Sequence, residues 1–561
     1  MELVSMSELG NSLRLMAIPV FLSFVAIVVL FADMVFDRED ERQWPAYLTI
    51  AGLVGALLLW LQNWLLFVPS QSDGRLMGWL RGLLNIQATT NPGLLFNGMF
   101  DPVGIGNMTL IASLLVIVVA LVATMLAPRY LEQRDMHRGE YYALLLFATV
   151  GLILMAGSVH LILVFLALEL LSIPLYILAG FARPNLASEE AGLKYFLLGA
   201  FASGFLLYGI ALLYGATGTM HLREMGQLLA QDFQSGRSLV LPGGSVNLML
   251  IGGIIMLMVG IGFKISLVPF HQWTPDVYDG APTPVTAFMI AGTKVGGFAM
   301  FINVIAALLP IGPTWWIPML IALSVLSMLG GNIGALRQTN IKRMLAYSSI
   351  AHAGYMMVGV VGIMSEVANF NGSSLSFPAL ILYLFVYALM NLGAFAVIIA
   401  MENSEGKAII ELEEFRGLGR RHPLLALLLA FFLLSLAGFP PTAGFFAKFF
   451  LFSGAVLGGQ LWLVALAILL SVISVYYYAR YIIAMYMQAP AEAKDESHVI
   501  RREPLPVVDA LREDVDEDIA AELPAPLRRP SWMVGTALVV TTALVIAIGI
   551  FPNPILQLFA P

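Results

Sequence analysis

The amino-acid sequence predicts an all-α polytopic membrane protein with about 14 transmembrane helices, and three observations carry that prediction. Hydrophobic residues make up 59% of the 561 residues and charged residues only 12%, with a mean hydropathy of +0.86. A water-soluble domain has about a quarter charged residues, so this chain could not cover itself with polar surface in water. The apolar residues form runs of about 20, the length that crosses a bilayer. Two of the longer apolar stretches also carry helix breakers.

The apolar runs predict fourteen spans, which we place at 13–35, 46–68, 107–127, 141–158, 159–181, 193–215, 247–270, 283–308, 315–336, 343–363, 378–400, 424–454, 460–486 and 533–551. The N-terminus lacks the basic region and cleavage site of a signal peptide, so we expect the first span to be retained. Residues 69–106 are mildly apolar, and we expect them to fold back on the protein. Residues 488–530 are rich in charge and proline and predict an exposed linker.

The basic residues predict the orientation of the spans. With the N-terminus outside, 20 of the 29 lysines and arginines fall in inside loops, 5 fall outside and 4 lie within spans. This asymmetry predicts that both termini lie outside the cytoplasm. We expect the chain to be a bacterial plasma membrane protein that crosses the bilayer many times.

The two breaker segments lie in corresponding parts of the chain. The first, at 260–284, carries Lys264 just ahead of Pro269, and the second places Pro441 just ahead of Lys448. Proline removes an amide donor, and freed backbone groups are tolerated at membrane depth only beside protein or water. The breakers are about 171 residues apart, which is five spans, and an odd number of spans inverts the second copy. Paired broken helices of this kind are typical of inverted-repeat transporters.

The chain therefore divides into five predicted parts. They are an N-terminal part with helices 1–3 at 1–139, a first repeat with helices 4–8 at 140–310, a second, inverted repeat with helices 9–13 at 311–487, the charged linker at 488–530, and helix 14 at 531–561.

Five ionisable residues interrupt apolar spans, and they are Glu169, Lys194, Lys264, Lys294 and Lys448. Each charge at a helix centre costs about 2.5–3.5 kcal/mol, so the set must be paired, hydrated or neutral. Burial disfavours the charged form of an amine, which suits a row of lysines to passing protons along intervening waters. The alternative for a single lysine is snorkelling to the interface, and it is strongest for Lys194, near the start of its span.

Glu169 and Lys194 are the natural partners of an ion pair, because Lys194 opens the helix that follows. Loosening such a pair would let the lysine release its proton, and the alternative is a static pair that fixes helix packing. His271 follows Lys264 by seven residues, which is two turns on one face if the helix is continuous. His352 shares its span with several hydroxyl side chains. For both histidines a place in the relay and simple packing stay equally open.

Several chemistries are excluded or unsupported. The chain has no cysteine, which excludes disulfides and cysteine-ligated iron–sulfur clusters. It shows no phosphate-binding glycine loop, no metal-ligand spacing and no Ser–His–Asp pattern. We therefore predict no cofactor and no metal in this chain, and no nucleic acid among its partners.

Several motifs carry a family resemblance. They are ELLSIPLYIL with Glu169, GLKYFLLGAFASGFLLYG with Lys194, FKISLVPFHQWTPDVYDGAPTPV with Lys264, AGTKVGGF with Lys294, QTNIKRMLAYSSIAHAGY, and LSLAGFPPTAGFFAKF with Lys448. Together they resemble the antiporter-like membrane subunits of respiratory complex I, and most of all subunit N, over roughly residues 140–490.

The resemblance implies fourteen helices, two inverted five-helix repeats, and broken seventh and twelfth helices. It also implies a modulating pair of Glu169 and Lys194, a central proton carrier at Lys264, a connecting lysine at Lys294 and a terminal lysine at Lys448. Flavin, iron–sulfur clusters and quinone would then lie in partner membrane and peripheral subunits of an NADH–quinone oxidoreductase.

Two other functions stay open at this point. The same lysines would serve a multi-subunit cation/proton antiporter of the related family. In a structural membrane subunit, by contrast, the charges would only organise packing.

Overall fold

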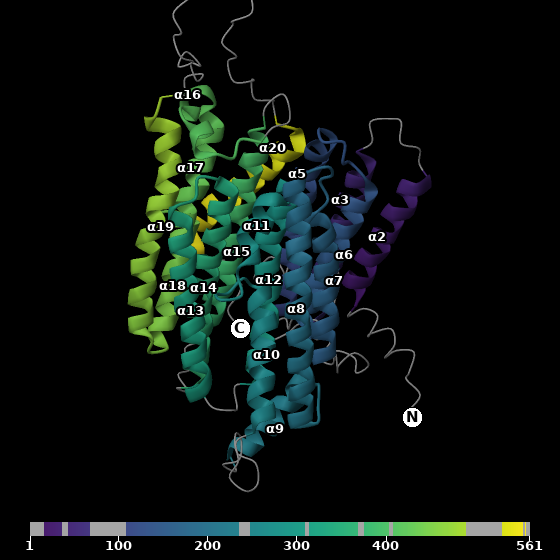
Figure 1. Cartoon of the computed structure of the whole chain (residues 1–561), viewed down its shortest axis with the longest axis vertical. Coiled ribbons are helices and arrows are strands. Elements are labelled where there is room, and N and C mark those ends of the chain that lie inside the picture. The colour runs from purple at the N-terminus through teal and green to yellow at the C-terminus, as the bar shows by residue number, and fades with distance from the viewer. Residues whose placement is uncertain are drawn as a thin grey trace, which may run out of the picture.

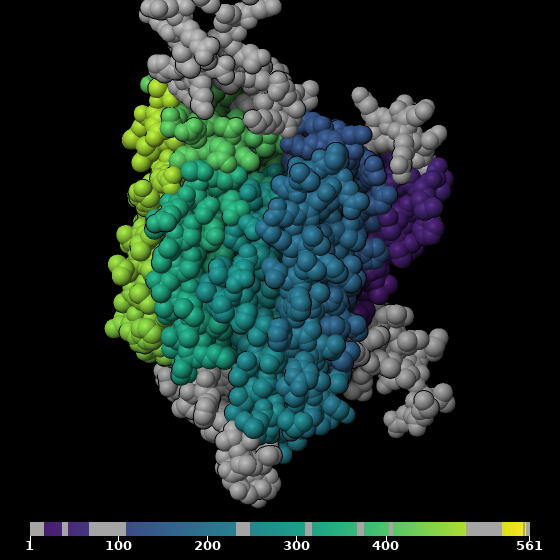
Figure 2. Space-filling view, in the orientation of Figure 1, coloured from purple at the N-terminus to yellow at the C-terminus, as the bar shows by residue number. Residues whose placement is uncertain are grey.

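The computed structural model describes residues 16–35, 43–67, 108–234, 247–308, 313–368, 375–402, 408–489, 530–553 and 556. Within these ranges the chain is almost wholly helical, and most of the helices run along the longest axis of the molecule (Figure 1). The early helices, purple to blue, lie on one side and the green to yellow-green helices on the other, as Figure 2 shows. The last helix, yellow in Figure 1, lies between them. Twelve of the described helices are long and apolar enough to cross a membrane, which confirms the predicted class.

The helices have the following bounds in chain order: α2 (Ala17–Val35), α3 (Trp44–Phe67), α5 (Met108–Glu132), α6 (Gly139–Gly157), α7 (Leu161–Ala179), α8 (Leu186–Thr217), α9 (Leu222–Gln234), α10 (Leu248–Lys264), α11 (Trp273–Gly280), α12 (Thr283–Leu308), α13 (Pro313–Leu336), α14 (Ile341–Ala368), α15 (Ser376–Ala400), α16 (Leu418–Arg421), α17 (Pro423–Ala437), α18 (Ala443–Leu457), α19 (Leu461–Met487) and α20 (Trp532–Ile550). A short 3-10 helix, η4, covers Leu412–Phe415.

Most of these bounds agree with the predicted spans to within a few residues. The clearest exception is α8, which begins seven residues before the predicted position 193. Asn185 starts it there, because its side-chain oxygen accepts hydrogen bonds from the amides of Ala187 and Ser188 at 3.0 and 3.3 Å. The sequence analysis also missed the short helix α9. The segment at 69–106 and nearly all of the linker at 488–530 lie outside the described residues.

Both predicted breaks are confirmed. Helix α10 ends at Lys264 and α11 begins at Trp273, while α17 ends at Ala437 and α18 begins at Ala443. Gly438 ends α17 with φ +85°, a left-handed conformation that strains other residues. A Cβ atom there would also lie 2.9 Å from the Lys448 side chain, so glycine lets this lysine approach the break.

Three helices form the protected centre of the molecule. In the most apolar stretch of α12, 100% of the residues are buried inside the protein, and in those of α14 and α15 the share is 94%. The share of buried residues is only 33% in α8 and 39% in α13 and α19. These three helices turn apolar side chains outward, as a lipid-facing helix does. Lys294 on α12 and His352 on α14 therefore lie in the interior.

Candidate functional site

Lys264 ends the first half of the broken helix α10–α11 and is 1% exposed. Its ammonium donates to the Ser172 hydroxyl of α7 at 2.8 Å and to the Tyr195 hydroxyl of α8 at 3.3 Å. The Tyr195 ring stacks on Trp273, the first residue of α11, with ring centroids 4.4 Å apart. The indole of Trp273 in turn donates to the carbonyl of Phe263 at 3.0 Å. The packing across the break thus fixes the position of the lysine.

Lys294 lies opposite the same break. Its side chain is fully buried on α12, and its ammonium donates to the carbonyl of Ile265 at 2.6 Å. Ile265 caps the C-terminus of α10, where backbone carbonyls have no partner within the helix. The same end carries the negative pole of the helix dipole, which attracts a cation.

Lys448 repeats this arrangement at the second break. From α18 its ammonium donates to the carbonyls of Leu436 and Ala437, at 3.1 and 2.9 Å, which end α17. A third bond goes to the Ser471 hydroxyl of α19 at 2.8 Å. The ammonium also lies 5.3 Å from the centre of the Tyr355 ring, within range of a cation–π contact. Both breaks therefore present free carbonyls to a buried lysine.

His352 lies in a buried polar cluster between the two breaks. Its Nδ1 is 2.8 Å from the Tyr383 hydroxyl, and its Nε2 is 3.4 Å from the Tyr478 hydroxyl. The His352 ring also contacts the ring of Tyr355 edge-on, at 5.7 Å between centroids. Because the Tyr355 ring faces Lys448, aromatic side chains connect the histidine with the second break.

A second cluster of buried hydroxyl groups lies beside His352. Tyr278 of α11 and Tyr387 of α15 both lie near Ser349 of α14, and the Tyr387 and His352 ring centroids are 5.2 Å apart. The three hydroxyls are buried without a hydrogen bond of normal geometry to any described residue. A buried polar group without a partner costs about 1–3 kcal/mol, so such groups mark places where water binds. The cluster suits a short water chain between the two halves.

Glu169 and Lys194 do not form the ion pair that the sequence predicted. The carboxylate of Glu169 accepts a short hydrogen bond from the Ser203 hydroxyl of α8. Ser203 lies nine residues beyond Lys194 on the same helix, which is about 13 Å of helical rise. Lys194 instead pairs with Glu190 one turn before it and with Asp276 of α11 at 2.8 Å. Ser203 lines the same narrow gap as Lys264, so Glu169 lies near the first break.

Asp276 is a residue that the sequence analysis missed. One carboxylate oxygen accepts from Lys194 of α8, and the other accepts from Arg343 of α14 at 2.8 Å. Asp276 thereby ties two long helices to α11, the short half of the first broken helix. The sequence signal that could have identified Asp276 is its position beside Pro275, in the first turn after the break.

Two further buried ionisable groups escaped prediction. Lys342 was counted among loop cations, yet its side chain is buried and donates to the carbonyls of Asp279 and Ala281 at the end of α11. Glu366 lies three residues beyond the predicted end of its span, inside α14, and accepts from the Ser376 hydroxyl at 2.8 Å. Glu169 is therefore not the only acid within a membrane helix.

His271 lies in the first break, half-buried. A shared face with Lys264 depended on a continuous helix, and α10 ends at Lys264, so that condition is not met and the role of His271 stays a prediction. His352, by contrast, is buried beside the hydroxyls of Tyr383 and Tyr478, and its place in the relay stays a prediction.

Buried lysines at two broken helices are typical of helical membrane proteins that translocate ions. The chain belongs to the NADH:quinone oxidoreductase/Mrp antiporter membrane family, whose model matches residues 158–474.

Individual relatives agree with this assignment. The chain is 44% identical over 451 residues to NADH-quinone oxidoreductase subunit N of Trichlorobacter lovleyi, covering 80% of this chain and 88% of the relative. It is 38% identical over 544 residues to subunit N of Moorella thermoacetica, covering 97% of each. A chain of respiratory complex I from Thermus thermophilus superposes with a TM-score of 0.68 at 31% identity, over 97% of this chain and 99% of that one. A chain of the Mrp complex from Dietzia has a TM-score of 0.70 at 19% identity, covering 98% and 96%, and shares the fold.

Proposed function

We propose that the chain is subunit N of an NADH–quinone oxidoreductase and moves protons across the membrane. In this relay Lys264, Lys294 and Lys448 carry the protons, and the charges of Glu169 and Lys194 modulate them. His352 lies between the halves, and His271 is a further candidate. Subunit-N relatives of at least 38% identity support this reading over a free-standing antiporter, because the Mrp likeness is one of fold.

One observation carries the proposal. The ammonium groups of Lys264, Lys294 and Lys448 are buried, and their hydrogen bonds go to hydroxyls and backbone carbonyls. A lysine in a tight carboxylate pair keeps its proton, whereas a buried amine with neutral partners can exchange it. A structural role would be better served by ion pairs such as that of Arg134 with Glu402, at 3.0 Å. The arrangement of the lysines therefore suits proton transfer.

The charge of Glu169 is suited to control the first carrier. A narrow gap lined by Ser172, Ser203 and Lys264 separates α7, α8 and α10, and it has no room for a water molecule in this conformation. Proton exchange there requires either the Ser172 hydroxyl or a small opening of the gap. If Lys194 left Asp276 and moved toward Glu169, α8 and α11 would shift against each other. This shift would change the width of the gap.

The membrane arrangement follows the same proposal. Each broken helix counts as one crossing, which gives fourteen crossings in two inverted five-helix repeats. The excess of basic residues in alternate loops supports both termini outside the cytoplasm. The chain has no cysteine to ligate an iron–sulfur cluster, which supports placing electron transfer through flavin, iron–sulfur clusters and quinone in partner subunits.

The test compares Lys264→Ala with Lys264→Arg in the assembled complex. Arginine keeps the positive charge but does not give up its proton, so both variants should lose NADH-driven proton pumping. Arg420→Ala, at an exposed residue of α16, is the matched control and should pump normally. If Lys264→Arg pumps like the unaltered complex, the charge is structural and the relay is refuted.

A further inference from the structure

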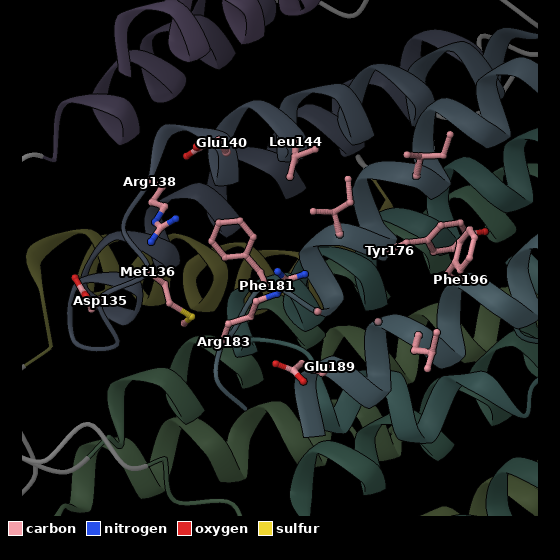
Figure 3. A pocket seen from close by; sticks show the side chains of 15 residues that line it. Asp135, Met136, Arg138, Glu140, Leu144, Tyr176, Phe181, Arg183, Glu189 and Phe196 are labelled. Atoms are coloured by element: carbon pink, nitrogen blue, oxygen red, sulfur yellow. The ribbon is translucent and has the colours of Figure 1, made fainter. Parts of the chain in front are cut away.

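A pocket of about 1040 Å³ lies outside the relay, between the turn that joins α5 to α6, the end of α7 and the start of α8 (Figure 3). Pockets for drug-sized ligands reach about 1,000 Å³, so this one can hold more than a single polar headgroup. By the distribution of basic residues it lies at the inside surface of the membrane.

The charged side chains lie toward one end of the pocket. Arg138 and Arg183 lie there with Asp135, Glu140 and Glu189, as Figure 3 shows. No ion pair joins these five side chains to one another or to any other described residue. Two free guanidinium groups beside free carboxylates match a ligand that itself carries both charges.

The other end of the pocket is apolar and continues onto an exposed, apolar side of α7 and α8. Ile173 and Ile177, one turn apart on α7, are 54% and 49% exposed. Leu193 and Phe196 of α8 are 58% and 51% exposed. Polarity thus runs from charged to apolar along the pocket, from the end of the helices into the span, as it does along a phospholipid in a bilayer.

We propose that this pocket binds one phosphatidylethanolamine molecule. Arg138 and Arg183 bind the phosphate, since guanidinium groups match phosphate oxygens with paired N–H donors. The neighbouring carboxylates accept hydrogen bonds from the primary ammonium, and the acyl chains lie along Ile173, Ile177 and Phe196.

The charge balance selects this lipid among others. A purely anionic headgroup would satisfy the arginines but would face three carboxylates, which repel it. A quaternary ammonium has no N–H to donate, so a choline headgroup would leave the carboxylates without hydrogen bonds. A protein segment could also cover the face, but it would not require charge at one end and an apolar path at the other.

The test measures lipid retained by the complete complex after purification in mild detergent, by mass spectrometry. The Arg138→Ala/Arg183→Ala double variant should retain one phosphatidylethanolamine fewer per complex than the unaltered protein, while Arg420→Ala should retain the full number. Equal phosphatidylethanolamine in all three, or loss of phosphatidylglycerol instead, would overturn the assignment. Loss of a neighbouring subunit with unchanged lipid would show that a protein segment fills the pocket.

A second measurement covers the case in which the double variant does not assemble. The unaltered complex, stripped of lipid, is titrated with fluorescent phosphatidylethanolamine and with equally labelled phosphatidylglycerol and phosphatidylcholine. Saturable binding of phosphatidylethanolamine at one site, at least tenfold tighter than of the other two, is expected. Equal binding of the three lipids excludes the site. Neither readout depends on proton pumping.

Discussion

Gly444, on the first turn of α18, tests how the second break holds Lys448. A Cβ atom at this position would lie 1.8 Å from the carbonyl oxygen of Ser435 and 2.7 Å from its carbon. Ordinary contact begins at 3.4 Å, so Gly444→Ala must separate α17 from α18 by about 1.6 Å. Both obstructing atoms are backbone, and they cannot turn aside.

That displacement acts directly on Lys448. The carbonyls of Leu436 and Ala437, which follow Ser435, lie 3.1 and 2.9 Å from its ammonium and would move beyond hydrogen-bond range. Overpacking costs about 1–3 kcal/mol. Each hydrogen bond to a charged group contributes about 1.5–3 kcal/mol. We therefore expect a lower thermal midpoint of the complex and at least a tenfold loss of NADH-driven proton pumping.

The assay has matched controls within the chain. A Cβ atom at Gly204 of α8 or at Gly535 of α20 meets nothing within 4 Å. Alanine at these two positions should leave pumping unchanged and stabilise the helix by up to about 1 kcal/mol. If Gly444→Ala melts and pumps like Gly204→Ala, the close approach of the two half-helices does not position Lys448, and the reasoning fails.

Three further predictions follow from individual contacts. Ser172→Ala removes the hydroxyl that accepts a hydrogen bond from Lys264 at 2.8 Å, a bond that contributes about 1.5–3 kcal/mol. Proton pumping should slow about tenfold while the complex stays intact. An unchanged rate would exclude this hydroxyl from the proton path. Asp276→Asn weakens the ion pairs with Lys194 and Arg343, whose side chains are about one-third exposed. Because water screens exposed pairs, the thermal midpoint should fall by the equivalent of only about 1 kcal/mol. The fall should be smaller still at high salt concentration. His137 lies outside the spans, where burial lowers its pKa from 6.5 against the opposing attraction of Asp33. The unfolded chain therefore binds this proton more tightly, so stability is complete above about pH 6.5 and declines as the pH falls; His137→Phe should reduce that decline, and an identical pH profile would contradict it.

The sequence was sufficient for those features that depend on local chemistry. The breaks could be placed because proline and glycine act on the backbone where they stand, and the burial of Lys264, Lys294 and Lys448 follows from the apolar runs around them. The start of α8 at Leu186 was missed by seven residues, although Asn185 is a strong N-cap and was the local signal for it.

Contacts between residues that are far apart in the chain could not be predicted from the sequence in the same way. Spacing alone suggested that Glu169 meets Lys194, but antiparallel packing of α7 and α8 places Glu169 level with Ser203. The carbonyl acceptors of Lys294 and Lys448 belong to every residue type, so sequence gives no signal for them. Lys342 lay in a charged loop motif, and only the tertiary structure shows that it reaches the end of α11.

The central claim is that the buried lysines change protonation during turnover. Infrared difference spectra between resting and NADH-driven complex, recorded with and without ¹⁵N-labelled lysine, report this directly. The account predicts lysine ammonium bands that shift in frequency with the ¹⁵N label. In the Lys264→Arg variant, the contribution of one lysine to these bands should disappear. Spectra without any lysine contribution, while the complex pumps at full rate, would contradict it.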